Sequence, residues 1–230
     1  MIPPNPTGKD YRAYQDRVSD AIAAAVRNAG VKNVVSLSSF GADQSSGTGP
    51  VVGLHDLEQK LNQIDSTNVL HLRAGYFMEN TLPQVGAIRM AGTMFGPVAP
   101  NLKLPMIATR DIGAAAADGL LRLAFRGKQT RELQGQRDLD YTEAAAIVGQ
   151  AIGKPDLGYI QAPDGQIRAA MVQTGMSDNI AGLILEMAVA INNGQMRTLE
   201  PRSAANTTPT KFETLVEDSF VPAYRQRAAA

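Results

Sequence analysis

The most constraining feature of the sequence is a repeated succession of an amphipathic helical pattern and a short, mainly apolar run. The first helical pattern follows Asp10 and stops before Gly30, where glycine can adopt the left-handed capping conformation. An apolar run at residues 31–37 comes next, and a second helix and apolar run occupy residues 53–64 and 68–72. Strands that are apolar throughout are typical of a parallel sheet covered by helices on both faces. We therefore predict an α/β fold.

Beyond Asn80 the predicted elements are shorter and less regular. The sequence predicts helices at residues 82–90 and 112–123, helices ending at 152 and 174, a helix at 180–191 and a last one opened by Thr210, with strands at 93–95, 103–107, 130–134 and 157–161. The expected N-caps are Asp111, Asp140, Asp164 and Ser177, and Glu143 completes a capping box with Asp140. Residues 228–230 are expected to be frayed.

Composition excludes several classes of function. Basic and acidic residues balance at 22 each without long runs of one sign, so we expect no nucleic-acid partner and no membrane partner. The chain has no cysteine and only two histidines, so we expect no disulfide, no cysteine nucleophile and no metal site. The start lacks the pattern of a signal peptide, and no apolar stretch reaches the roughly 20 residues of a membrane helix. These features predict a cytoplasmic protein that binds a small molecule.

Five motifs together point to a family. They are IPPN at residues 2–5, VVSLSSFGA at 34–42, LHDLE at 54–58, LRAGYFMEN at 72–80 and TRDI at 109–112. In order and spacing they resemble the NmrA-like family of atypical short-chain dehydrogenases. The resemblance implies a Rossmann-type parallel sheet with a smaller carboxyl-terminal substrate domain, and NADP or NAD bound across the carboxyl ends of the strands.

One element of the family pattern is missing from the sequence. Family members hold the pyrophosphate at a Gly-x-x-Gly-x-x-Gly turn, and no segment here matches that turn; Gly41, Gly47 and Gly49 are interpreted as loop glycines. We therefore predict a partial Rossmann-type sheet, lacking about two βαβ units of roughly 30 residues each, in which cofactor binding is weak or absent. Residues 1–125 are assigned to the truncated NAD(P)-binding part, interleaved with the substrate part, and residues 126–230 mainly to the substrate-binding domain.

The resemblance implies candidate residues near the amino terminus and at the end of the first strand. Pro3 and Pro4 match a turn that lies against the cofactor, although a disordered terminus is the simpler reading. Ser38 and Ser39 end a parallel strand at the edge where such sheets bind ligands, and Ser39 is the candidate catalytic serine. A plain strand cap is the alternative for this pair.

The usual catalytic Tyr-x-x-x-Lys motif of the superfamily is absent. Its tyrosine and lysine positions fall at Pro50 and Leu54, and neither side chain can transfer a proton. His55 lies next to the lysine position and is the candidate proton donor, since histidine titrates near neutral pH. A histidine that only packs or caps is an equal alternative.

The last group of candidates follows the second strand, where the family's chain passes close to nicotinamide and substrate. Tyr76 is a candidate for catalysis and for cofactor contact, and Arg73, Gly75, Phe77 and Asn80 are candidate cofactor contacts. For Arg73 and Arg110, pairing with Asp111 or Glu79 at the surface is the competing interpretation, and Met78 is expected in the core.

Three functions remain open from sequence. The first is an NAD(P)H-dependent reductase of a small quinone or carbonyl compound, and the second is a noncatalytic NAD(P)-sensing regulator. The third is an inactive fragment. Because the strand at residues 31–37 is apolar and is expected to expose one edge, a homodimer formed through that edge is also predicted.

Overall fold

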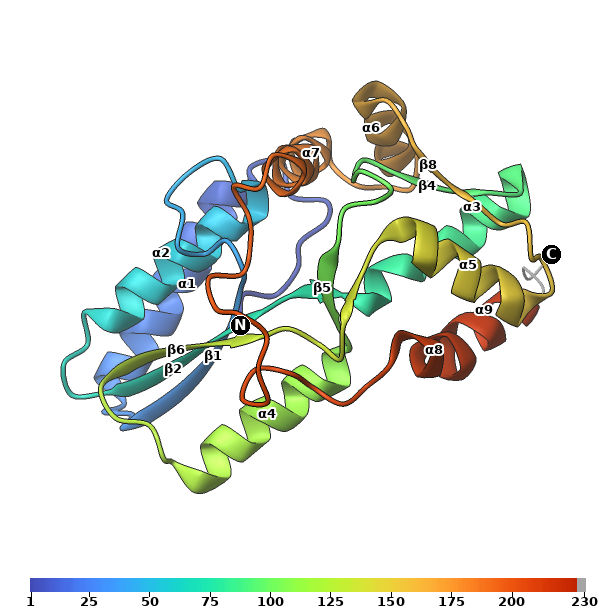
Figure 1. Ribbon diagram of the computed structural model, residues 1–230. Helices are drawn as coiled ribbons and strands as arrows, with labels where there is room; N and C mark the ends of the chain where they lie inside the picture. Colours follow the sequence, from blue (N-terminus) through green and yellow to red (C-terminus); the bar gives the residue numbers. More distant parts are fainter. Residues whose placement is uncertain (227–230) are drawn as a thin grey trace.

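A computed structural model describes residues 1–226 and shows a three-stranded parallel sheet between two helical layers (Figure 1). The strand order is β1 (Asn33–Ser39), β2 (Asn68–Ala74) and β6 (Lys128–Leu133). Helices α1 (Tyr11–Asn28) and α2 (Val52–Asn62) cover one face, and α4 (Thr109–Arg122) covers the other. The predicted α/β class with a parallel, Rossmann-like sheet is therefore confirmed.

The remaining elements build a second part beside the sheet, in which α3, α5, α8 and α9 cluster (Figure 1). They are η1 (Gly49–Val51), β3 (Tyr76–Phe77), η2 (Met78–Thr81), α3 (Gln84–Ala91), β4 (Met94–Gly96), β5 (Leu104–Ile107), β7 (Asp138–Leu139), α5 (Tyr141–Ile152), β8 (Tyr159–Gln161), α6 (Asp164–Gln173), α7 (Asp178–Asn192), α8 (Phe212–Leu215), the π turn η3 (Val216–Phe220) and α9 (Val221–Arg225). Small sheets join β3, β5 and β7, and β4 with β8. Strands β3, β4 and β5 belong to the second part, but they precede β6, which completes the main sheet. The two parts are therefore interleaved in sequence.

Helix capping follows local sequence where the partner is close in the chain. The capping box of Asp140 and Glu143 is present, and Ser177 accepts a hydrogen bond from the Ile180 amide as an N-cap should. The N-cap prediction for Asp164 is wrong, because Pro163 occupies that position and Asp164 is the first helical residue. The predicted fraying of residues 228–230 lies outside the described residues.

The Asp111 prediction is also wrong, and for a tertiary reason. Ala108 is the N-cap of α4, so Asp111 lies inside the first turn. Its buried carboxylate accepts hydrogen bonds from the amide and hydroxyl of Thr210, at 3.0 and 2.7 Å. Thr210 is therefore bonded to Asp111, 99 residues earlier in the chain, and does not cap the last helix. That helix begins after Lys211.

Two glycines allow β5 to pass close to neighbouring backbone. A side chain at Gly75 would overlap the Pro105 carbonyl, and one at Gly135 would overlap the Met106 carbonyl. Gly135 also has φ of +76°, which favours glycine. β5 can therefore lie close to the end of β2 only because Gly75 and Gly135 have no side chains.

Strand β1 lies at one edge of the sheet. Its backbone pairs with β2, and the bonds from Asn68 to Lys32 and from Phe40 to Ala74 show that even-numbered residues face β2. The amide and carbonyl groups of Val35 and Leu37 consequently point to the other side, where no described strand pairs with them. Within residues 1–226, no helix is long and apolar enough to cross a membrane.

Candidate functional site

A cavity of about 440 Å³ opens at the carboxyl end of β1. Its walls come from the amino-terminal segment, the end of β1, the start of α2 and β3. The lining residues are Met1, Ile2, Pro4, Tyr11, Gln15, Leu37, Ser38, Ser39, Pro50, Val51, Leu54 and Phe77. The lining is mainly apolar, with a few hydroxyl and amide groups, as expected for a site that orients a small organic ligand.

A second cavity of about 220 Å³ adjoins the first and shares Pro4, Tyr11 and Pro50 with it. Its remaining walls are Asn5, Pro6, Met176, Ile180 and Ile184, so it extends toward α7. The two cavities together form a cleft between the sheet edge and the second part of the molecule. Open α/β sheets bind ligands at this carboxyl edge.

The amino-terminal segment is built into this cleft. The Pro3 carbonyl accepts a hydrogen bond from the Tyr14 hydroxyl at 3.1 Å, and Ile2 is buried against α1 and α2. Ser177 at the start of α7 donates its amide to the Pro6 carbonyl at 2.8 Å and its hydroxyl to the Gly8 carbonyl at 2.6 Å. The segment is therefore ordered, and the reading of it as a disordered terminus is wrong.

Four of the predicted site residues meet in the first cavity, namely Pro4, Ser38, Ser39 and Phe77. They come from three segments that are far apart in sequence. Ser39 ends β1 with its side chain half-buried. Phe77 is the second residue of β3 and packs partly against the sheet core.

Ser38 and Arg73 belong to a buried polar network. The Ser38 hydroxyl donates to the Glu58 carboxylate at 2.5 Å, and Arg73 donates two hydrogen bonds to the same carboxylate. Glu58 is 2% exposed, so its charge requires this partner. Glu58 is thus the partner of Arg73. It stands in place of both partners considered from the sequence, a ligand phosphate and the surface carboxylate of Asp111 or Glu79.

His55 is fixed by the loop that follows β1. Its Nδ1 lies 2.9 Å from the Ala42 carbonyl oxygen, and because a carbonyl oxygen only accepts, Nδ1 is the donor of this hydrogen bond. The side chain is half-buried on α2. This contact gives His55 a role in holding the loop.

Tyr76 points into the second part of the molecule. Its hydroxyl lies 2.9 Å from that of Tyr141, whose ring stacks on Tyr159 with centroids 4.4 Å apart. Burial raises the pKa of the Tyr76 phenol, and hydrogen bonds with Tyr141 and Asn80 oppose the rise. Asn80 itself is exposed, and Gly75 is buried against Pro105. These three candidates lie around β3 and η2, whereas Ser39 lies in the cleft.

Sequence reasoning missed two polar residues of the cleft, Tyr11 and Gln15. The Gln15 amide donates to the Pro50 carbonyl at 2.8 Å, and Gln15 is 2% exposed. A signal was available, because Tyr11 and Gln15 continue the stripe of Val18 and Ile22 on the apolar face of α1. Polar side chains on such a stripe indicate a buried polar site.

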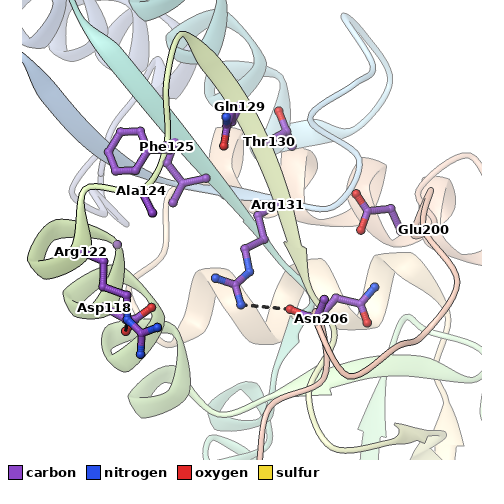
Figure 2. Close-up of a pocket in the computed structure, with 12 residues that line it drawn as sticks. Asp118, Arg122, Ala124, Phe125, Gln129, Thr130, Arg131, Glu200 and Asn206 are labelled. Carbon is purple, nitrogen blue, oxygen red and sulfur yellow. Dashed lines mark hydrogen bonds and ion pairs between the residues drawn. The ribbon is translucent and has the colours of Figure 1, made fainter.

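Another cavity, of about 350 Å³, lies between α4 and β6 (Figure 2). Leu70 and Gln129, which pair near the amino-terminal ends of β2 and β6, place it away from the carboxyl edge. Two acidic residues, Asp118 and Glu200, and two basic residues, Arg122 and Arg131, line it. Arg122 pairs with Asp118, and Arg131 donates to the Ala205 carbonyl at 3.0 Å.

The fold is that of an open, Rossmann-like α/β protein with a cleft at the carboxyl edge of its sheet, and the sequence assigns the family. The model of the NmrA-like family matches residues 10–217, so the chain belongs to that family. The sequence matches none of the curated proteins closely enough to indicate a relative.

Solved structures with the same fold include three enzymes. An NADPH-dependent quinone oxidoreductase from Escherichia coli is 21% identical, with 93% of this chain and 76% of that chain covered and a TM-score of 0.68. A triphenylmethane reductase from Citrobacter sp. is 16% identical, covering 96% and 74%, with a TM-score of 0.75. A nucleoside-diphosphate-sugar epimerase from Staphylococcus aureus is 16% identical, covering 93% and 75%, with a TM-score of 0.72. At these identities the likeness shows the fold alone.

The residues of the cleft fit one end of a nicotinamide dinucleotide. The apolar cavity beside Ser39 suits a flat ring with an amide, because hydroxyl groups stand at its edge. The sequence has no Gly-x-x-Gly-x-x-Gly turn, and Arg73 forms hydrogen bonds with Glu58. Among residues 1–226, no cluster of acidic, histidine or cysteine side chains could hold a metal ion.

Proposed function

We propose that the chain binds the nicotinamide end of NAD(P)H in the cleft and reduces a small quinone or carbonyl compound. The observation that carries this proposal is the apolar cavity at the carboxyl end of β1, which brings the Ser39 hydroxyl together with Pro4 and Phe77. A ring bound there would lie at the edge of the sheet, where ligands of this fold class bind. Reduction needs a hydride, which NAD(P)H supplies when bound.

Each cavity residue has a role in this proposal. Pro4, Leu54 and Phe77 exclude water from the nicotinamide ring. Ser39 donates a hydrogen bond to the reacting carbonyl oxygen of the quinone. Glu58 and Arg73 act only through Ser38, whose hydroxyl they orient at the cavity floor.

We further propose that the dinucleotide binds weakly to this 230-residue chain, because the cleft offers contacts to the nicotinamide end and no cradle for the pyrophosphate. Calorimetric titration with NADH and with NADPH measures the affinity and the preference between them. A dissociation constant in the low micromolar range for either cofactor would contradict weak binding.

The test of activity uses a quinone and two serine variants. Ser39→Ala should lower the NADPH-dependent reduction of naphthoquinone by about tenfold, because one hydrogen bond to the reacting oxygen is lost. Ser45→Ala is the matched control, since Ser45 is exposed in the loop after β1. Equal rates in the two variants would remove Ser39 from the site.

A second candidate function is noncatalytic NAD(P) sensing. It is favoured by Pro50 and Leu54, which stand where the superfamily has its catalytic tyrosine and lysine and which both line the cavity. This function predicts saturable cofactor binding without quinone reduction, so the same titration and assay separate the two candidates.

As a partner, we propose a second copy of the chain, bound through the free edge of β1. The edge is apolar at Val35 and Leu37, and α4 beside it exposes Leu121, which is 85% exposed. An unpaired apolar edge of this kind is a template for strand pairing.

A further inference from the structure

Tyr11 occupies the junction of the two cavities of the cleft. It is the first residue of α1, and it lines both the 440 Å³ and the 220 Å³ cavity. Only Pro4 and Pro50 share this position, and neither has a side chain that can donate a hydrogen bond. Tyr11 is thus the one side-chain donor common to both spaces.

The backbone and ring of Tyr11 are held firmly. Its amide donates to the side-chain carbonyl of Asn179 on α7 at 2.9 Å. Its ring stacks on that of Tyr14, with centroids 5.8 Å apart and an angle of 28° between the planes. A donor fixed in this way loses little entropy when it binds a ligand.

The hydroxyl of Tyr11 differs from those of Tyr14, Tyr76, Tyr141 and Tyr159 in having no hydrogen-bond partner among residues 1–226. Tyr14 donates to Pro3, Tyr76 pairs with Tyr141, and Tyr159 donates to Val98. No residue in the range 1–226 makes a hydrogen bond to the Tyr11 hydroxyl. Burial, with a smaller effect from Tyr14, raises the pKa of the Tyr11 phenol above its usual 10.0, so the group is a protonated donor at neutral pH.

The space beyond Tyr11 is apolar. Pro6, Met176, Ile180 and Ile184 wall the smaller cavity, and methionine adapts its shape to flat rings. An occupant needs apolar ring surface on both sides of Tyr11 and one oxygen that accepts a hydrogen bond between them.

We propose that the Tyr11 hydroxyl binds the carbonyl oxygen of an apolar ring compound that spans both cavities, and so selects quinones and aryl ketones over hydrocarbons of the same shape. The inference deepens the proposed function by naming the substrate class and its donor. It concerns binding by this chain's own residues and requires no cofactor.

The test compares two ligands and two variants by equilibrium dialysis without cofactor. Naphthoquinone carries the carbonyl oxygens, and naphthalene has the same rings without them. The chain contains no cysteine, so the quinone cannot form a thiol adduct. Tyr11→Phe should weaken naphthoquinone binding by about fivefold and leave naphthalene unchanged, since one net hydrogen bond is lost.

Tyr14→Phe is the matched control. It removes a hydroxyl from the stacked neighbour, whose hydrogen bond goes to Pro3, and should leave the ratio of the two affinities unchanged. Thermal unfolding of Tyr11→Phe should match the wild type, because the deleted hydroxyl has no partner in the fold.

Three results would overturn the inference: no saturable binding of naphthoquinone to the wild type, an unchanged affinity in Tyr11→Phe, or an equal loss for both ligands. Failure of the proposed reductase appears differently. In that case NADPH does not reduce naphthoquinone, while the Tyr11-dependent difference between the ligands persists.

Discussion

The Arg73 guanidinium forms two hydrogen bonds with the Glu58 carboxylate, at 3.0 and 2.7 Å, beneath the cleft. The pair is buried, with side-chain exposures of 13% for Arg73 and 3% for Glu58. In this two-bond arrangement the carboxylate occupies the edge of the guanidinium that carries Nε and Nη2. Arg73, which the sequence suggested as a phosphate ligand, therefore positions the Glu58 carboxylate that accepts the hydrogen bond of Ser38 at the floor of the first cavity.

Glu58→Gln should destabilise the protein by about 3 kcal/mol, because it leaves the buried guanidinium of Arg73 without a counter-charge. Urea unfolding measures the change. Asp20→Asn breaks an exposed pair with Lys60 and should cost less than about 1 kcal/mol. Similar costs for the two variants would show that burial adds nothing to the Glu58 pair.

His71 should make stability fall in mild acid. It is 1% exposed, its Nε2 lies 2.9 Å from the Asn62 side-chain oxygen, and burial lowers its pKa below the usual 6.5. Above pH 6.5 the ring is neutral in both states, whereas below it the unfolded chain takes up a proton that the folded chain resists, so unfolding is favoured. Nearby Arg73 and Lys128 strengthen this resistance and Glu58 weakens it.

The measurement is the urea midpoint at pH 7.5 and 5.5, in the wild type and in His71→Gln. Other groups also titrate in this window, so the informative quantity is the difference between the two proteins. The wild type should lose more stability than the variant on acidification. Parallel losses would mean that His71 is protonated in the folded protein as readily as in the unfolded chain.

Gly75→Ala should be strongly destabilising, by about 2 kcal/mol or more, since the added methyl group overlaps the Pro105 carbonyl on β5. The backbone must shift, and Phe77 on the neighbouring β3 shifts with it. Gly86→Ala is the control: it adds the same group inside α3 with open space around it, and should stabilise by about 0.5–1 kcal/mol. Thermal unfolding compares them, and a neutral Gly75→Ala would show that β5 moves freely.

The free edge of β1 should make association depend on concentration. Light scattering after size exclusion should show twice the chain mass of 24.5 kDa at high concentration, and hydrogen exchange at Val35 and Leu37 should slow as the dimer forms. Val34 is an internal reference, because its amide faces β2 in either state. A monomer at every concentration, with fast exchange at Val35, would leave this edge solvated.

The sequence predicted the elements whose evidence is local. The order of helices and main-sheet strands, the capping box at Asp140 and the cap at Ser177 depend on residues within a few positions of each other. Boundaries moved by a few residues, as where α4 begins at Thr109. The two-residue strands β3 and β7 escaped prediction because tertiary contacts alone define them.

The candidate site divided in the same way. Pro4, Ser39 and Phe77 were identified through family motifs, and the structure brings them into one cavity. The partner of Arg73 was not predicted, because Glu58 lies 15 residues away on α2. The polar residues on the apolar stripe of α1 mark Tyr11, but the two cavities that it lines are built by segments distant in sequence, so its position between them could not be predicted.

The hydrogen bonds from Ser177 to the Pro6 and Gly8 carbonyls connect the amino-terminal segment on one side of the cleft with α7 on the other. These hydrogen bonds position α7, and α7 supplies Ile180 and Ile184 to the smaller cavity. Shortening the amino-terminal segment would therefore alter ligand selectivity and the orientation of a helix about 170 residues further along the chain in a single step.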